Sequence, residues 1–251
     1  MEMQSLIERL PLLPAIFNKL RTKYFFYRVK RKNNEEIFTE IFRKNVWGGK
    51  ESVSGRGSDS AQTETIIRQL PLIWKKYEVK SLLDIPCGDF NWMRHVDLGK
   101  VDYLGADIIP ELVAKNSAQY ERDGVHFKRL DVIRDQIPGL DLILCRDCLV
   151  HLSFDQIFSA LNNICRSGSR YLLTTTFTDR RENRDIVTGD WRPLNLEAFP
   201  FELPAPIELI NEGCTEGDGA YDDKSLGLWC IADICEKLAT HSAELTSADY
   251  T

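Results

Sequence analysis

Hydrophobic residues between positions 80 and 175 gather in short runs that alternate with amphipathic stretches. Short, wholly apolar runs are typical of parallel strands covered on both faces, and the stretches between them have helical spacing. This alternation predicts an α/β fold with a mostly parallel, doubly wound sheet and helices on both sides. The runs that we interpret as strands span residues 81–85, 102–106, 125–130, 140–144 and 171–175.

The hydrophobic pattern changes beyond the last of these runs. Residues 178–206 are polar and rich in Arg, Pro and aromatic residues, and long loops of this kind in compact domains are typically lids or binding loops. Two later apolar runs, 206–211 and 226–232, predict a final antiparallel pair at the sheet edge, which makes seven strands. We therefore expect one Rossmann-like domain over residues 59–238, followed by a polar, disordered tail at 239–251.

Residues 1–58 are predicted to form a helical, basic extension that ends in a Gly-rich loop. Apolar residues within 5–29 recur at helical spacing opposite basic ones, and residues 35–44 repeat the amphipathic pattern. The loop from Trp47 to Ser58 is either a flexible linker or a loop that wraps a ligand, and the sequence leaves both open. Its end can also cap the helix that follows.

Charge is distributed unevenly along the chain. The formal net charge is −6, but residues 1–32 hold eight basic and two acidic residues, a net of +6, which leaves −12 for the remainder. The acidic body argues against a nucleic acid as substrate. The basic segment predicts peripheral contact with an anionic membrane, or packing on the body or on a second subunit of a homodimer; a solvated basic face is the open alternative.

The cysteines give no metal signature. Cys145 and Cys148 have CxxC spacing, but no second pair accompanies them among the seven, so we expect no metal site. Free thiols in a reducing compartment fit this scatter best. The start of the chain has no signal-peptide pattern, and no apolar run approaches the ~20 residues that span a bilayer. We therefore expect a cytoplasmic protein.

Acidic residues stand at the ends of three of the predicted strands, namely Asp84, Asp107 and Asp131. Because the carboxyl ends of successive parallel strands lie along one edge of the sheet, we expect these residues to line one ligand site. Asp107 follows Asp84 by 23 residues, which is the distance at which an acid meets ribose hydroxyls in dinucleotide folds. The three acids together predict a nucleoside ligand.

The turn after the first strand separates the classes of nucleoside ligand. Its residues, 84–90, contain the single glycine Gly88 between the acids Asp84 and Asp89. A pyrophosphate needs several glycines for close backbone approach and no nearby anions. Two acids suit a ligand with an ammonium and a sulfonium group instead. S-adenosylmethionine carries both groups and has no phosphate.

These residues resemble the class I S-adenosylmethionine-dependent methyltransferases over roughly residues 60–235. Pro86 and Phe90 replace two of the three glycines in the first motif of that family. The resemblance continues through 105–107, 130–132 and 141–151. It implies a seven-stranded, Rossmann-like methyltransferase sheet with an antiparallel edge strand, and S-adenosylmethionine as the cofactor.

The resemblance also implies roles for individual residues. Asp107 would bind the ribose diol, Asp131 would lie at the adenine amino group, and Cys87 with Gly88 would face the methionine part. Arg146, just past the fourth strand, would lie beside the methionine. The full set that we expect at the cofactor is Trp47, Ser58, Asp84, Pro86, Cys87, Gly88, Asp107, Ile108, Asp131, Val132 and Arg146.

Methyl transfer to an oxygen requires that the acceptor lose its proton. His151 is our candidate base and Asp147 the second candidate; the open alternatives are a histidine that holds its loop by hydrogen bonds and an aspartate that caps the next turn. The long loop and the turn before the last strand supply the candidates for substrate binding, against the alternative of a solvated surface loop. These candidates are Asp179, Trp191, Arg192 and Tyr221.

The segments 47–48, 54–55, 84–89 and 189–195 together resemble a sugar- or small-metabolite-directed group of methyltransferases. We therefore expect O-methylation of a hydroxyl on a small-molecule or carbohydrate substrate. Two alternatives are open. One is N-methylation of a small metabolite, and the other is a non-catalytic, adenosyl-ligand-binding partner of a membrane-associated pathway.

Overall fold

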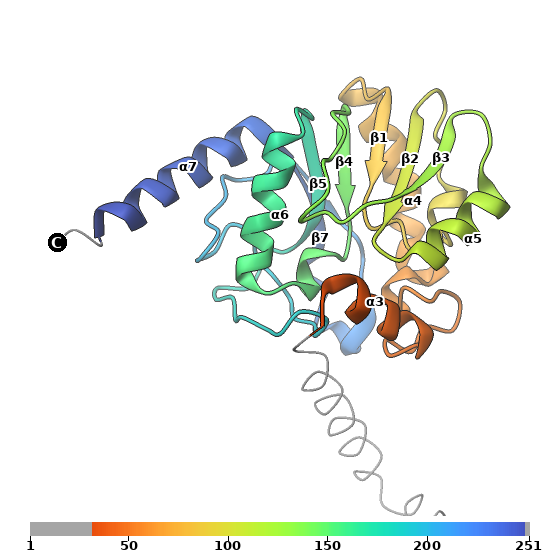
Figure 1. Ribbon diagram of the computed structural model, residues 1–251, viewed down its shortest axis with the longest axis horizontal. Coiled ribbons are helices and arrows are strands. Elements are labelled where there is room, and N and C mark those ends of the chain that lie inside the picture. The colour runs from red at the N-terminus through yellow and green to blue at the C-terminus, as the bar shows by residue number, and fades with distance from the viewer. Residues whose placement is uncertain (1–31, 249–251) are drawn as a thin grey trace, which may run out of the picture.

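The computed structural model describes residues 32–248, and its centre is one seven-stranded sheet with the order β3-β2-β1-β4-β5-β7-β6 (Figure 1). Strands β1 to β5 run parallel, and β7 is antiparallel to both β5 and the edge strand β6. The predicted mostly parallel sheet with antiparallel pairing at its edge is confirmed. The strands are β1 (Ser81–Asp84), β2 (Asp102–Asp107), β3 (Val125–Arg129), β4 (Leu142–Cys145), β5 (Tyr171–Phe177), β6 (Glu208–Asn211) and β7 (Lys224–Cys230).

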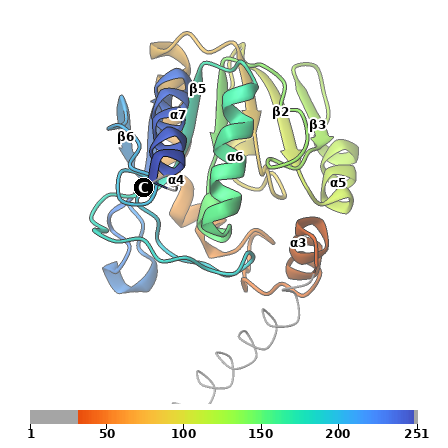
Figure 2. The ribbon, with the colours of Figure 1, turned by 60° about the vertical axis from the view of Figure 1, so that its left-hand side comes forward.

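Helices cover both faces of the sheet, and one further helix lies at the carboxyl ends of its strands. Figures 1 and 2 show α6 and α7 together on one face, with α4 behind the sheet. Helix α3 lies beyond the carboxyl ends of the central strands, where the strand arrows point. The helices are α3 (Asn34–Arg43), α4 (Ser60–Lys76), α5 (Pro110–Tyr120), α6 (Phe154–Arg166) and α7 (Ile231–Ala248).

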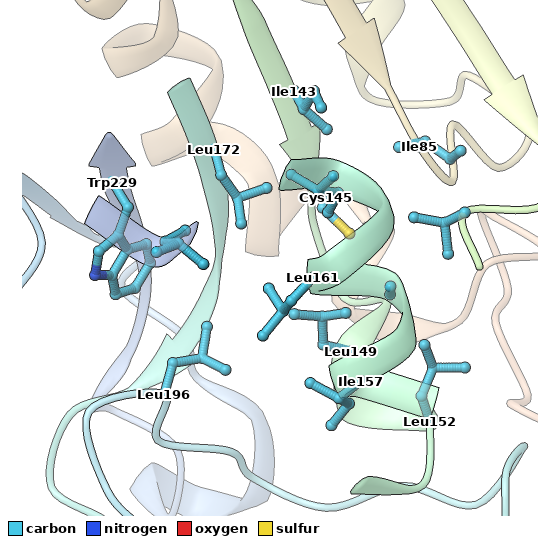
Figure 3. Packing of buried hydrophobic residues seen from close by; sticks show 14 of the residues in the cluster. Ile85, Ile143, Cys145, Leu149, Leu152, Ile157, Leu161, Leu172, Leu196 and Trp229 are labelled. Atoms are coloured by element: carbon cyan, nitrogen blue, oxygen red, sulfur yellow. The ribbon is translucent and has the colours of Figure 1, made fainter. Parts of the chain in front are cut away.

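Strand β4 shows why an uninterrupted apolar run forms a central strand. Side chains alternate between the two faces of a strand. Leu142 and Leu144 join the cluster beneath α4, whereas Ile143 and Cys145 join the cluster beneath α6 and α7. Figure 3 shows Ile143 and Cys145 in this second cluster, which also contains Leu161 of α6. Because both faces are covered, every position of β4 is buried.

The C-terminal part of the chain differs from the prediction. Strand β7 ends at Cys230, and α7 continues to Ala248 where the sequence predicts a disordered tail from residue 239. Ile231, Ile234 and Leu238 are buried at helical spacing and belong to the cluster that holds the inner face of α6. The apolar residues that look like the end of a strand are therefore the inner face of a helix.

The cysteines also differ from the prediction of free thiols. Cys165 on α6 and Cys235 on α7 form a disulfide, with a Cα–Cα distance of 5.6 Å. The two residues are 70 positions apart, so their pairing depends on the packing of two helices, one of which the sequence pattern hides. The other cysteines of the described chain are free thiols.

None of the helices in residues 32–248 is long and apolar enough to cross a membrane. The amphipathic segment predicted at 5–29, with its membrane and homodimer alternatives, lies outside the described residues. The second predicted N-terminal helix is α3, which begins with a capping box. The Asn33 side chain accepts a hydrogen bond from the Glu36 N–H, and the Glu36 carboxylate accepts one from the Asn33 N–H.

Candidate active site

A cavity of about 1030 Å³ opens at the carboxyl ends of β1, β2 and β4, the edge at which α/β sheets bind ligands. We call it the cofactor cavity. Every residue that the sequence assigns to the cofactor lies in its lining. These are Trp47, Ser58, Asp84, Pro86, Cys87, Gly88, Asp107, Ile108, Asp131, Val132 and Arg146. The structure thus brings the predicted set together, although contact with a ligand stays a prediction for each residue.

The turn after β1 depends on Gly88. Its φ of +56° is a conformation that side chains disfavour, and a Cβ there would lie 2.2 Å from Ser54 Oγ in the Gly-rich loop. The Gly88 N–H donates to Asp107 Oδ2 (3.2 Å), and Asn116 Nδ2 of α5 donates to the Gly88 carbonyl (2.7 Å). The turn is therefore fixed from both sides. Asn116 carries no motif that could reveal this role in the sequence.

Two acids of the cofactor cavity are buried without an ion-pair partner among the described residues. Burial raises the pKa of Asp84 to about 7, although Tyr103 Oη donates a hydrogen bond to its carboxylate (2.7 Å). Burial likewise raises the pKa of Asp107 to about 6, although the Ile109 N–H donates to it (3.0 Å). A positively charged ligand would compensate for the lost hydration of these carboxylates.

Asp131 is the third acid along the carboxyl edge of the sheet. Its Oδ1 accepts a hydrogen bond from the Ile133 N–H (2.8 Å), while its Oδ2 accepts none from the described residues. Val132 and Ile133 follow it in the lining of the cavity. An apolar wall with a free carboxylate oxygen fits a flat, heteroaromatic ring that carries an amino group. Together with Asp84 and Asp107, these features fit S-adenosylmethionine.

The Gly-rich loop is held against the cofactor cavity, which decides between the two readings of this segment. Asp89 Oδ1 accepts a hydrogen bond from Ser52 Oγ (2.8 Å), and Asp89 Oδ2 accepts one from the Val53 N–H (3.1 Å). The Trp47 indole stacks on the imidazole of His151, with ring centroids 4.5 Å apart. The segment is therefore a wall of the cavity rather than a flexible linker.

Helix α3 supplies the outer wall of the same cavity, which the sequence did not predict. Asn34, Phe38 and Phe42 lie in the lining, so that two aromatic rings one helical turn apart face the cavity. The amphipathic pattern of 35–44 was the available signal. It predicts an inward face but not what that face covers.

His151 lies at the end of a short 3₁₀ turn after β4 and is buried. Its Nδ1 is 2.8 Å from the carbonyl oxygen of Asp190, and because a carbonyl only accepts, Nδ1 carries the proton. Nε2 then has the lone pair and bonds to none of the described residues. Burial lowers the pKa of His151 to about 4, so the ring is neutral at physiological pH. Nδ1 therefore fastens the loop through its hydrogen bond, and the lone pair of Nε2 is left to accept a proton.

Asp147, itself half-buried, belongs to a group of charges whose other members, Arg146, Glu212 and Lys224, are buried. Lys224 Nζ lies 2.7 Å from its carboxylate, and Arg146 Nη1 lies 3.4 Å from it. Burial opposes ionisation, but these two cations hold the pKa of Asp147 well below its usual range. Arg146 also pairs with Glu212 at 2.6 Å. Asp147 is thus a fixed anion, which favours an orienting role over proton transfer.

A second cavity of about 840 Å³ adjoins the first, and we call it the acceptor cavity. Trp47, Ser54, Asp147 and His151 line both cavities. Of the residues predicted to bind substrate, Trp191 and Tyr221 line the acceptor cavity, with ring centroids 4.9 Å apart and an interplanar angle of 77°. Further lining residues are Arg56, Gly57, Phe177, Glu216 and Lys224.

Arg192 and Asp179 do not line either cavity. The Arg192 side chain is fully buried, and its guanidinium donates to the backbone carbonyls of Arg184 (3.2 Å), Leu149 (3.1 Å) and Leu152 (2.8 Å). Arg192 therefore fastens the long loop to the turn that carries His151. Asp179 is exposed, and its N–H donates to Asp223. The structure therefore brings neither side chain to a cavity, and the predicted substrate contacts of both residues find no support in this geometry.

Comparison with known proteins identifies the fold. No family model matches the sequence, and no curated protein matches it either. The structure is similar to human N-acetylserotonin methyltransferase in complex with SAM, at 12% identity and a TM-score of 0.54, over 88% of this chain and 67% of the human one. The chain has the class I methyltransferase fold.

Two further methyltransferase structures support this assignment. N-methyltransferase NodS from Bradyrhizobium japonicum WM9, in complex with S-adenosyl-l-homocysteine, matches at 15% identity and a TM-score of 0.55, over 76% of this chain and 96% of NodS. The methyltransferase domain of bacterial CtHen1-C matches at 12% identity and a TM-score of 0.51, over 67% of this chain and 98% of that domain. The fold implied by the sequence resemblance is confirmed, and identities this low carry no information about the acceptor.

Proposed function

We propose that the protein transfers a methyl group from S-adenosylmethionine to a hydroxyl group of a small-molecule or carbohydrate acceptor. The observation that carries the cofactor assignment is the row of strand-end acids, with Asp84 and Asp107 buried and lacking ion-pair partners among the described residues. These acids disfavour a nucleotide phosphate and favour a cation. The complexes of the human enzyme and of NodS, which hold SAM and S-adenosyl-l-homocysteine, agree with this assignment.

Different residues of the cofactor cavity are expected to bind different parts of the cofactor. By the sequence resemblance, Asp107 would hold the ribose hydroxyls, and Asp131 with Val132 would hold the adenine. Gly88 and Asp84 would face the methionine part, whose ammonium group suits a carboxylate. Bound there, S-adenosylmethionine supplies an electrophilic methyl carbon.

The chain itself orients the acceptor oxygen and removes its proton. His151 lines both cavities, so its Nε2 is our candidate to accept the proton as the new oxygen–carbon bond forms. Nδ1 keeps its proton, which it donates in a hydrogen bond to the Asp190 carbonyl, and the anionic Asp147 nearby stabilises the imidazolium. Trp47, stacked on the ring, holds it in this orientation and keeps water out.

Calorimetric titration with S-adenosylmethionine and with NAD tests the cofactor assignment. We expect S-adenosylmethionine to bind and NAD not to bind; the reverse result would refute the proposal. The Asp107→Asn variant should weaken cofactor binding about 10- to 100-fold, because it removes a hydrogen bond to a charged group. The Asp102→Asn variant is the matched control, since Asp102 is exposed at the other end of β2. Equal effects of the two variants would contradict the role of Asp107.

A further inference from the structure

The acceptor cavity contains a recess that exists because residue 57 is a glycine. A Cβ on Gly57 would lie 3.1 Å from Asp147 Oδ2, 3.4 Å from Lys224 Nζ and 3.6 Å from Glu216 Oε2. The φ of Gly57 lies outside the left-handed region, so the backbone does not require glycine here. The missing side chain instead leaves open the point where Asp147 converges with Glu216 and Lys224, which come from a distant part of the chain.

The chemistry of this recess is mixed rather than of one sign. Lys224 Nζ is 2.7 Å from Asp147 and 3.5 Å from Glu212, so its charge is already compensated. The Glu216 carboxylate forms no hydrogen bond or ion pair with any residue in 32–248. A phosphate in the recess would meet the carboxylates of Asp147 and Glu216, and an ammonium group would meet Lys224. Neighbouring hydroxyl groups match this mixture of donors and acceptors, because each hydroxyl both donates and accepts a hydrogen bond.

The wall beside the recess is aromatic. Trp191 and Tyr221 meet edge to face, and Phe177 completes the wall with ring centroids 6.1 Å from both. Such a wall accepts an apolar ring face. A sugar ring has both properties at once, since its C–H face is apolar and its edge carries hydroxyls. Arg56, exposed on the same turn as Gly57, adds hydrogen-bond donors at the mouth of the cavity.

We propose that the acceptor cavity binds a sugar whose neighbouring hydroxyls enter the Gly57 recess, and that Gly57 determines this specificity. The inference rests on the proposed methyl transfer in one respect, namely that the bound sugar is the methyl acceptor. The C–H face lies on the wall formed by Trp191 and Tyr221, and Glu216 and Lys224 bridge adjacent hydroxyls. A further hydroxyl of the same ring is then directed toward His151, which both cavities share.

Binding measurements with defined probes test this proposal. The full-length protein, saturated with S-adenosylhomocysteine, is titrated with the methyl pyranosides of glucose, galactose, mannose and rhamnose. Catechol and phenethylamine serve as an aromatic diol and an amine, and saturation-transfer NMR is the readout. We expect saturable binding of at least one glycoside, stronger than that of catechol or the amine. Failure of all four glycosides, or tighter binding of catechol or the amine, would overturn the proposal.

Two variants locate the bound glycoside. Gly57→Ala should weaken its binding at least tenfold, because the added methyl group occupies the recess. Glu216→Gln should weaken it about fivefold and leaves the backbone untouched, so it serves even if Gly57→Ala does not fold. Asp218→Asn, exposed in the same loop, is the matched control and should change nothing. Unchanged glycoside binding in Glu216→Gln would exclude the recess.

The cofactor titration separates this inference from the proposed function. If S-adenosylhomocysteine binds and no glycoside does, the cofactor assignment stands and the sugar is excluded. If neither S-adenosylmethionine nor S-adenosylhomocysteine binds, the proposed methyl transfer fails first. A glycoside that binds and loses affinity in Gly57→Ala would still support the recess as a sugar site.

Discussion

The two adjoining cavities are built in different ways. The cofactor cavity is formed largely by turns at the ends of neighbouring strands, and Asp84, Asp107 and Asp131 line it because a parallel sheet aligns its carboxyl ends. The acceptor cavity is formed by segments that are far apart in sequence, from the Gly-rich loop to the turn before β7. A repeated topology fixes the first cavity, whereas individual long-range contacts fix the second.

Their electrostatics differ in the same way. In the cofactor cavity, Asp84 and Asp107 have no ion-pair partner among residues 32–248, and burial raises the pKa of both. In the acceptor cavity, Asp147 is paired with Lys224 at 2.7 Å. We therefore expect the first cavity to discriminate by charge. We expect the second to discriminate by shape and by the direction of its hydrogen bonds, which suits the uncharged acceptor that we propose.

His151, which both cavities share, should give the largest effect when it is changed. We expect His151→Ala to lower kcat at least 100-fold, the usual range for loss of a general base being about 10²- to 10⁴-fold. The affinity for S-adenosylmethionine should change much less, because Asp107 and Gly88 are untouched. Release of S-adenosylhomocysteine measures turnover, and calorimetry measures affinity.

The exposed His126 of β3 provides the control, and His126→Ala should leave both quantities unchanged. Equal losses of turnover and affinity in His151→Ala would reduce His151 to a residue that holds the loop through Asp190. A turnover that hardly changes would favour an amine acceptor, which can reach its neutral form without a base on the enzyme.

Arg192 tests whether the long loop acts as a scaffold. Arg192→Met should lower the free energy of unfolding by about 3 kcal/mol, because three backbone carbonyls lose a donor. Those of Leu149 and Leu152 are buried, and each buried group left unsatisfied costs about 1–3 kcal/mol, offset in part by relaxation. Urea denaturation measures this change, and the exposed Arg181→Met is the control. If Arg192→Met keeps its stability but no longer binds acceptor, the sequence-based assignment of Arg192 to the substrate is right after all.

The contrast between the cavities explains what the sequence could predict. The strands, and the acids that end them, follow from local periodicity, because the direction of a parallel strand decides which of its residues reaches the ligand edge. The same reasoning cannot place Arg192, whose partners include Leu149 and Leu152, some forty positions away. The sequence pattern of a Trp-Arg pair in a polar loop is the same whether the guanidinium faces a ligand or the backbone.

Charge pairs show the same limit. Lys224 lies 77 positions from Asp147, and the Arg146–Glu212 pair is separated by 66, so no local spacing marks either one. Helix α7 was missed for a different reason. Its first residues continue the apolar run of β7, and only packing against α6 shows that the period has changed from 2 to 3.6.

The smallest effect that we predict concerns the charge of the cofactor cavity. The pKa of Asp84 is raised to about 7, so below this pH the carboxyl group is neutral and above it the group is an anion. A bound cation favours the anion, and the affinity for S-adenosylmethionine should therefore rise between pH 5.5 and 8. If the cation lowers the pKa of Asp84 by about one unit, the gain is at most about tenfold.

S-adenosylhomocysteine, which lacks the sulfonium charge, should gain less. In Asp84→Asn, which can still accept the hydrogen bond of Tyr103, the pH dependence should become flatter. Calorimetry at both pH values measures these affinities, and an affinity for S-adenosylmethionine that falls with pH would show that the cofactor cavity does not discriminate by charge.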